Sequence, residues 1–132
     1  IFDYKFVGYN YRMASLNAAL ALSQIKNLKK LIKIKRSIYE IYNKSFKNLK
    51  YCHIVKEPNY SKSNYWQNAI FLKKKLINQR NKIIKKLRSQ KIDVTIGWTL
   101  ISEMKHFKNC PKSDLTQSKI ISKSIINLPS FK

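Results

Sequence analysis

The sequence GYNYRMASLNAAL, residues 8–20, joins a polar, tyrosine-rich turn to the start of the longest helical pattern in the chain. Gly8 permits a close backbone approach that a side chain would prevent, and Ser15 is a suitable N-cap for the helix that follows. Asn10 and Arg12 place hydrogen-bond donors beside this turn. The stretch predicts a helix start around which the rest of the chain packs, although a purely structural turn is an alternative.

The apolar residues after Ser15 recur mostly every three or four positions, as they do on one face of a helix. This pattern predicts one long helix from Ser15 to about Lys47. Residues 18–22 are apolar on all sides of that helix. We therefore expect this part to be buried, either against the rest of the protein or against a second subunit.

Four later segments are rich in aliphatic, aromatic and β-branched residues and are bounded by polar residues or proline, as strands usually are. They cover residues 51–55, 65–72, 92–96 and 125–129. Helical patterns separate several of them. A strand, helix, strand order of this kind builds an α/β layer with helices packed on a sheet.

Two shorter helices are predicted between these strands. Asn78 is a suitable cap for a helix over 79–89, and Asp114 has the spacing of a capping residue for another helix. In the second of these helices, Ile120 and Ile121 are expected to face the core.

The chain has a net charge of +22, with 28 Lys and Arg against 6 Asp and Glu. Clustered cations gain affinity for nucleic acids by releasing counterions from phosphates, so a basic polyanion-binding module is one interpretation. However, only four of these cations are arginines, the residue type that reads bases and phosphates through paired hydrogen bonds. The lysines are also spread over most segments, and we expect no specific nucleic-acid partner.

Cys52 and Cys110 are isolated from each other and from any pair of histidines, so the sequence predicts no metal site. His53 is expected to be a partly exposed strand residue. Unpaired cysteines suit a reducing, cytoplasmic setting. No apolar run reaches ~18 residues, and the sequence therefore predicts no membrane span.

The ordered string GYNYRMASLNAALALSQI, followed by a basic helix through Tyr42 and Asn43, resembles the characteristic segment of the DegT/StrS sugar aminotransferases. The similarity continues at residues 68–72, 80–82, 87–92, 109–111 and 126–130. These enzymes use pyridoxal phosphate and have the aspartate-aminotransferase (fold type I) architecture. The resemblance implies an α/β (α+β) small C-terminal domain with one long N-terminal helix, a small, mainly antiparallel sheet and two further helices.

The resemblance also implies a domain organisation. Residues 1–132 would form a single C-terminal domain, with the long helix over 15–47 and a sheet and helix subdomain over 51–129. A catalytic large domain, with the lysine that forms a Schiff base with the cofactor, would lie upstream. No lysine here lies in the matching motif, so no catalytic residue is expected in this chain.

Asn10 and Arg12 match family residues that reach across a homodimer interface toward the cofactor phosphate of the neighbouring subunit. The resemblance therefore implies that they are the cofactor-binding residues of an intact enzyme. An amide and a guanidinium are suitable donors for a phosphate group.

The segment around Trp98 and the run 107–115 are similar to the family branch that acts on UDP-linked keto sugars in legionaminic-acid-type pathways. Trp98 is the expected substrate-binding residue, although tryptophan is also common in protein cores. The Arg, Pro and His of the branch motif are replaced by Thr95, Ile96 and Ser102. These replacements remove a fixed cation and a titratable group from the region near the nucleotide-sugar site.

The resemblance implies the C-terminal domain of a nucleotide-sugar aminotransferase that depends on pyridoxal phosphate. Such an enzyme transfers an amino group from glutamate to a UDP-linked keto sugar in cell-surface polysaccharide or nonulosonic acid biosynthesis. The domain is expected to be inactive alone. The alternatives are an inactive, truncated remnant of such an enzyme and a basic polyanion-binding module.

Overall fold

The computed structural model of the chain describes residues 8–9 and 12–131. Its strands are β1 (Cys52–Ile54), β2 (Asn68–Leu72), β3 (Thr95–Ile96) and β4 (Ile125–Leu128). They form a sheet with the order β1-β2-β4-β3, in which every neighbouring pair is antiparallel. All four lie within the segments that the sequence predicts as strands, although each is shorter than predicted.

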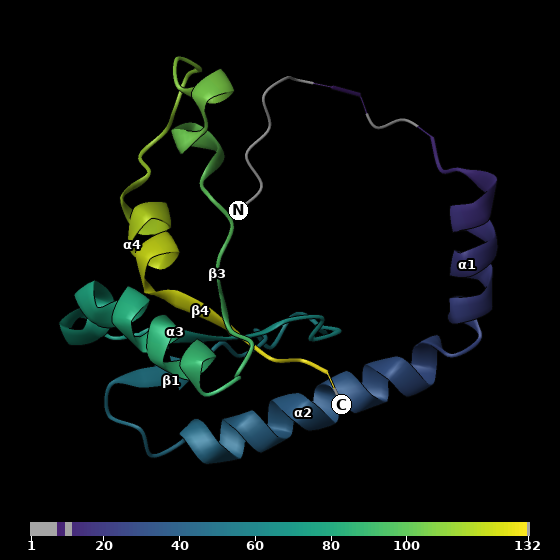
Figure 1. The fold of residues 1–132 in the computed structure, drawn as a ribbon, viewed down its shortest axis with the longest axis horizontal. Helices are drawn as coiled ribbons and strands as arrows, with labels where there is room; N and C mark the ends of the chain where they lie inside the picture. Colours follow the sequence, from purple (N-terminus) through teal and green to yellow (C-terminus); the bar gives the residue numbers. More distant parts are fainter. Residues whose placement is uncertain (1–7, 10–11, 132) are drawn as a thin grey trace.

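Helices make up the rest of the regular structure of the described residues (Figure 1). The α-helices are α1 (Ser15–Ile25), α2 (Leu28–Phe46), α3 (Arg80–Ser89) and α4 (Thr116–Ser124). The 3-10 helices are η1 (Lys74–Gln79), η2 (Ile101–Glu103) and η3 (Lys105–Phe107). The predicted combination of helices with a small antiparallel sheet is confirmed.

The predicted single helix from Ser15 to Lys47 is wrong in one respect, because it is divided into α1 and α2 at Lys26 and Asn27. The amide of Asn27 donates to the carbonyl of Gln24, a three-residue step that closes α1, and α2 begins directly afterwards. Asparagine competes with helical hydrogen bonding and favours helix ends. The apolar spacing continues across the break, so periodicity alone does not reveal it.

The predicted caps have mixed outcomes. Ser15 is the first residue of α1, and the N-cap is Ala14, which has no side chain that can cap the helix. Asn78 lies inside η1 and does not cap α3. In contrast, the carboxylate of Asp114 accepts hydrogen bonds from the amide and the hydroxyl of Thr116, at 2.9 and 2.7 Å. The predicted acidic cap is therefore present at the start of α4.

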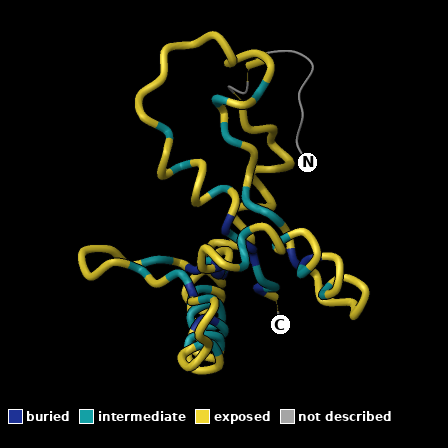
Figure 2. Tube along the Cα trace, turned by 90° about the vertical axis from the view of Figure 1, so that its left-hand side faces the viewer, coloured by how far each residue is buried: buried dark blue, intermediate teal, exposed yellow. Residues whose placement is uncertain are grey.

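The hydrophobic core lies where the sheet meets α2 and α3. Figure 2 shows the buried segments in the middle of the molecule, with exposed segments extending from them. The core residues are Tyr39, Ile54, Tyr65, Ile70, Leu72, Ile84, Val94 and Ile126. Two of these, Val94 and Ile126, are 0% exposed. Ile126 occupies the middle of the sheet, since it pairs with Ile70 on one side and Ile96 on the other.

The prediction that Ile120 and Ile121 face the core is wrong, because they are 48% and 46% exposed. The buried residue of α4 is Ser124, at the end of the helix. A guanidinium nitrogen of Arg80 donates to the carbonyl of Ser122, which ties α4 to α3. The helix is held by such polar contacts at its C-terminal end, so its apolar residues do not identify its inner face.

Helix α1 extends away from the sheet and the other helices (Figure 1). None of its residues, all of which the structure describes, is buried. Leu16, Leu20 and Ile25 are 81%, 61% and 62% exposed. An isolated helix of this length is marginal in water without tertiary packing. The expected burial of residues 18–22 is thus not provided by the described part of this chain, and burial against a second subunit stays a prediction.

Replacing Ile126 with alanine tests the position of the core. We expect the free energy of unfolding to fall by about 2–5 kcal/mol, because the substitution removes apolar contacts and leaves a cavity in the sheet. Urea unfolding followed by circular dichroism measures this change.

The matched control is Ile121→Ala, which makes the same chemical change on the exposed side of α4. It should lower the free energy of unfolding by less than about 1 kcal/mol. Equal losses in the two variants would contradict the assignment of the core.

Candidate functional site

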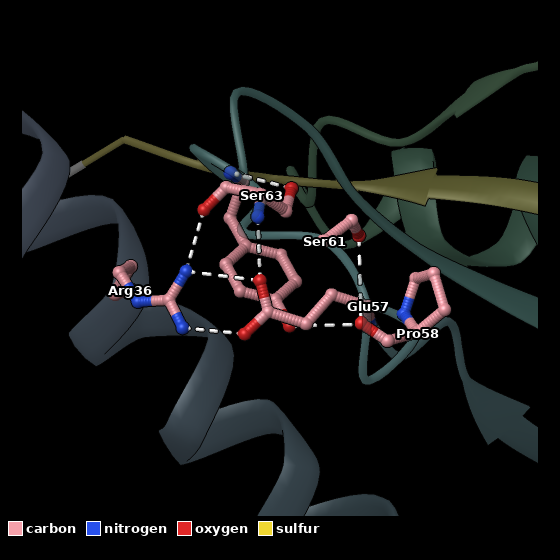
Figure 3. Close-up of polar contacts among 6 residues, drawn as sticks. Arg36, Glu57, Pro58, Ser61 and Ser63 are labelled. Carbon is pink, nitrogen blue, oxygen red and sulfur yellow. Dashed lines mark hydrogen bonds and ion pairs between the residues drawn. The ribbon is translucent and has the colours of Figure 1, made fainter.

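A bidentate ion pair fixes the loop between β1 and β2 to α2 (Figure 3). Arg36 donates from Nη2 to Oε1 of Glu57 at 2.5 Å and from Nη1 to Oε2 at 3.0 Å. Its Nη1 also donates to the carbonyl of Ser63 at 2.6 Å. The amide of Ser63 donates in turn to Oε2 of Glu57 at 2.5 Å. We call these three residues the loop clamp.

The loop clamp holds an aromatic pair and a strained backbone. Tyr65 has a φ of 46°, which is unfavourable for a residue with a bulky side chain. Its amide donates to Oγ of Ser63, and its hydroxyl accepts from the amide of Glu57. The ring of Tyr65 stacks on that of Tyr39, with centroids 3.9 Å apart, and burial raises the pKa of Tyr39 to about 12. The conformation of Tyr65 is therefore fixed by surrounding contacts.

A shallow cavity of about 300 Å³ opens beside the same loop. Its lining residues are Val55, Lys56, Glu57, Pro58, Ser61, Ser63, Tyr65, Gln67 and Ala69. The lining offers serine hydroxyls but no histidine that could activate them, and its carboxylate is occupied by Arg36. This cavity therefore lacks the groups of a catalytic site.

The C-terminal segment is anchored by Ser130, which is 4% exposed. Oγ of Ser130 accepts hydrogen bonds from the amide and the side-chain nitrogen of Asn68, at 2.9 and 3.1 Å. The carbonyl of Ser130 accepts from Lys35, and the carbonyl of Pro129 accepts from the hydroxyl of Tyr42 at 2.8 Å. These contacts give residues 126–130, which carry part of the family resemblance, a structural role.

Arg12 is exposed in the segment that precedes α1. It forms no hydrogen bond or ion pair with the residues that the structure describes, so its guanidinium is available to an outside group. Asn10 lies outside the described residues. The expectation that Asn10 and Arg12 together present donors to a phosphate therefore stays a prediction.

Trp98 is 58% exposed, so the alternative that it is a core residue is wrong. Its ring stacks on that of Trp66, with centroids 5.9 Å apart and an interplanar angle of 24°. Trp66 is itself 61% exposed. Trp66 falls within the strand predicted over residues 65–72, but β2 begins only at Asn68. No sequence spacing relates the two tryptophans, and their contact follows from the tertiary fold.

Gly97 brings Trp98 close to the sheet. A Cβ atom at position 97 would lie 2.7 Å from Cγ2 of Ile125, closer than two non-bonded carbon atoms approach in proteins. Of the replaced motif positions, Thr95 and Ile96 lie in β3, and both accept hydrogen bonds from the side chain of Asn127. Thr95 and Ile96 therefore help to hold β3 against β4.

The described residues contain no group of three or more His, Cys, Asp and Glu side chains that could hold a metal ion. Cys52 is half-buried, which raises the pKa of its thiol, and Cys110 is exposed. His53 lies in β1 and is exposed, with its ring tilted against Phe71. Within residues 8–9 and 12–131, no helix combines the length and apolarity needed to cross a membrane.

The sequence pattern of the DegT/DnrJ/EryC1/StrS aminotransferase family matches residues 2–132. The chain belongs to this family. Among its curated relatives, GDP-perosamine synthase of Vibrio cholerae is 34% identical over 87 residues, which are 66% of this chain and 23% of that protein. The family resemblance inferred from the sequence is confirmed.

Solved structures of other aminotransferases share the fold. PseC of Helicobacter pylori, an aminotransferase involved in the biosynthesis of pseudoaminic acid, has a TM-score of 0.80 and 21% identity, over 95% of this chain and 34% of that chain. A sugar aminotransferase of Streptococcus pneumoniae in its PLP form has a TM-score of 0.77 and 19% identity, over 91% of this chain and 31% of that one. The present chain spans about a third or less of the length of these relatives.

Replacing Gly97 with alanine tests the close approach of this segment to β4. We expect the free energy of unfolding to fall by about 1–3 kcal/mol, because the new methyl group collides with the β-branched side chain of Ile125. Urea unfolding followed by tryptophan fluorescence reports both the stability and the environment of Trp98.

Gly8→Ala is the control, since a Cβ atom at that position meets nothing within 4 Å among the described residues. It should change the free energy of unfolding by no more than about 0.5 kcal/mol. A harmless Gly97→Ala would show that the segment can move away from β4.

Replacing Glu57 with glutamine tests the loop clamp. The hydrogen bonds from Arg36 lower the pKa of Glu57 from 4.5 to about 2 in the folded chain. The ionised carboxylate therefore stabilises the fold above pH 4.5, and this stabilisation is lost as the pH falls toward 2. Glu57→Gln should lower the unfolding midpoint at pH 7 and remove the part of the acid sensitivity that depends on this group.

Thermal unfolding of both proteins between pH 2 and pH 7 measures the effect. Glu103→Gln is the matched control, because Glu103 is exposed in η2 and forms no ion pair within the described part of the chain. Parallel pH curves for the wild type and Glu57→Gln would contradict the role of the clamp.

Proposed function

We propose that the chain is the C-terminal domain of a nucleotide-sugar aminotransferase that depends on pyridoxal phosphate. The match of residues 2–132 to the aminotransferase family carries this proposal. The similarity to GDP-perosamine synthase supports a nucleotide-linked sugar as the substrate. The intact enzyme transfers an amino group from glutamate to a keto sugar, in the biosynthesis of a cell-surface polysaccharide or a nonulosonic acid.

In this proposal the chain helps to bind and position the cofactor and the substrate, and the reacting lysine belongs to another part of the enzyme. Pyridoxal phosphate supplies the amino-group carrier and electron sink when bound. Arg12 fits the phosphate of this cofactor, because its guanidinium is exposed and has no partner among the described residues. Asn10 is the second proposed donor to the same phosphate.

The dimer is part of the same proposal. Helix α1 is exposed over its whole length, although residues 18–22 within it are apolar on all sides. Burying its leucines and isoleucine against a second subunit would remove this surface from water and stabilise the helix. The same contact would bring Arg12, just before α1, to the neighbouring subunit.

Trp98 is the proposed substrate-binding residue, and its exposure leaves its ring accessible to a ligand. The nucleotide is either UDP, as the resemblance to the legionaminic-acid branch implies, or GDP, as in the name of the Vibrio relative. The loss of the motif Arg and His means that another group must make their contacts. The test of amino transfer therefore uses both a UDP-linked and a GDP-linked sugar.

The test of amino transfer uses the complete polypeptide loaded with pyridoxal phosphate. We expect 2-oxoglutarate to form from glutamate when a UDP- or GDP-linked 4-keto sugar is present. No amino transfer with either class would contradict the proposal and favour an inactive remnant of such an enzyme.

Replacing Arg12 with alanine in the same polypeptide should weaken the binding of pyridoxal phosphate by about ten- to hundredfold, because a charge-assisted hydrogen bond to the phosphate is lost. Equilibrium titration of the cofactor by absorbance measures this change. Lys29→Ala removes an exposed cation from α2 and should leave the affinity unchanged. Equal affinities of wild type and Arg12→Ala would remove Arg12 from the site.

A further inference from the structure

Two tryptophan rings lie side by side on the surface of the chain. Trp66 precedes β2 and Trp98 follows β3, and both rings are more than half exposed although they stack on each other. Burying a tryptophan side chain is favourable in free energy, because its large apolar surface is removed from water. The only two tryptophans of the chain are thus paired outside its core, where they expose a large aromatic surface.

Each tryptophan directly follows a residue whose backbone is constrained by neighbouring groups. The amide of Trp66 donates to the side-chain oxygen of Asn64 at 2.9 Å, and the preceding Tyr65 is held by the loop clamp. On the other side, Gly97 lies close to the side chain of Ile125 directly before Trp98. The two rings already contact each other without a ligand, which lowers the cost of ordering them on binding.

We propose that Trp66 and Trp98 together form the surface on which the nucleobase of the substrate stacks. This inference rests on the proposed function and extends it from Trp98 to a second residue and to one part of the substrate. A nucleobase is a flat aromatic ring, and stacking on an aromatic side chain is a strong, sequence-tolerant contact. The net charge of +22 complements the diphosphate that such a substrate carries.

The contact predicts which substrates the surface accepts. Stacking uses the face of the base and not its hydrogen-bonding edge, so both purine and pyrimidine nucleotides should bind to it. Discrimination between UDP and GDP then requires groups other than the two tryptophans. The surface selects a nucleotide over a free sugar phosphate.

The experiment is a fluorescence titration of the chain, in which Trp66 and Trp98 are the only tryptophans. UDP and GDP should quench the emission in a saturable way, because a stacked base lies against the rings. Pyrophosphate and ribose 5-phosphate should bind through charge without comparable quenching. This comparison uses only the wild-type chain.

Variants then separate the two rings. Trp66→Leu should weaken UDP binding by about tenfold, since one stacking contact is lost, with Trp98 remaining as the reporter. Trp66→Phe keeps an aromatic face and should stay within about threefold of the wild type. Tyr60→Leu is the matched control, because it removes an aromatic ring that is 92% exposed in the same loop between β1 and β2, and it should have no effect. Circular dichroism verifies that each variant is folded.

Several results would overturn the inference. These are equal quenching by UDP and pyrophosphate, no binding of UDP or GDP, and unchanged UDP affinity in a folded Trp66→Leu variant. If Trp66→Leu does not fold, the wild-type comparison and Trp66→Phe still decide.

Failure of the base-stacking surface can be distinguished from failure of the proposed aminotransferase function. In the complete enzyme, Trp66→Leu should raise the KM for the nucleotide sugar about tenfold and leave the KM for glutamate unchanged. Amino transfer with an unchanged nucleotide-sugar KM would refute the base-stacking surface alone. Base binding that depends on Trp66, without any amino transfer, would refute the aminotransferase function alone.

Discussion

The ion pair between Arg36 and Glu57 is the contact on which the arrangement of the surface depends. It joins the middle of α2 to the long loop between β1 and β2 (Figure 3). With two parallel hydrogen bonds, the pair is directional as well as attractive. It holds the positive φ of Tyr65, and the next residue is Trp66. An interaction on one face of α2 thus determines where an aromatic ring stands at the start of β2.

The sequence predicts the elements of this fold better than their contacts. The four strands, α3 and α4 follow from local composition, and the family resemblance supplies their antiparallel arrangement. The break at Asn27 is not visible, because the apolar spacing of α1 continues into α2 with little change. The outward position of Ile120 and Ile121 is also invisible, since α4 is held through a carbonyl and Arg80, and main-chain contacts leave no periodic signal.

The candidate site divides in the same way. Arg12 and Trp98 are found by resemblance, because they lie in stretches that match a family motif. Trp66 and Glu57 are missed, since each acquires its meaning from a partner distant in the sequence. A lone tryptophan in a strand-like segment predicts core packing, and only the tertiary fold brings it to Trp98. Likewise, the sequence presents Arg36 as one of several cations in a basic helix, and only the tertiary fold shows its contact with the loop between β1 and β2.

The break between α1 and α2 bears on whether binding at Arg12 and binding at the tryptophan pair influence each other. Arg12 lies before a helix that has no buried residue in the described part of the chain, whereas the tryptophan pair lies just before β2 and just after β3. No shared packed element joins them, so the chain by itself offers no mechanical route for cooperativity between an anion at Arg12 and a ring at the tryptophans. Their binding free energies add independently in an isolated chain. Any communication between the two must be created by the assembly that encloses α1.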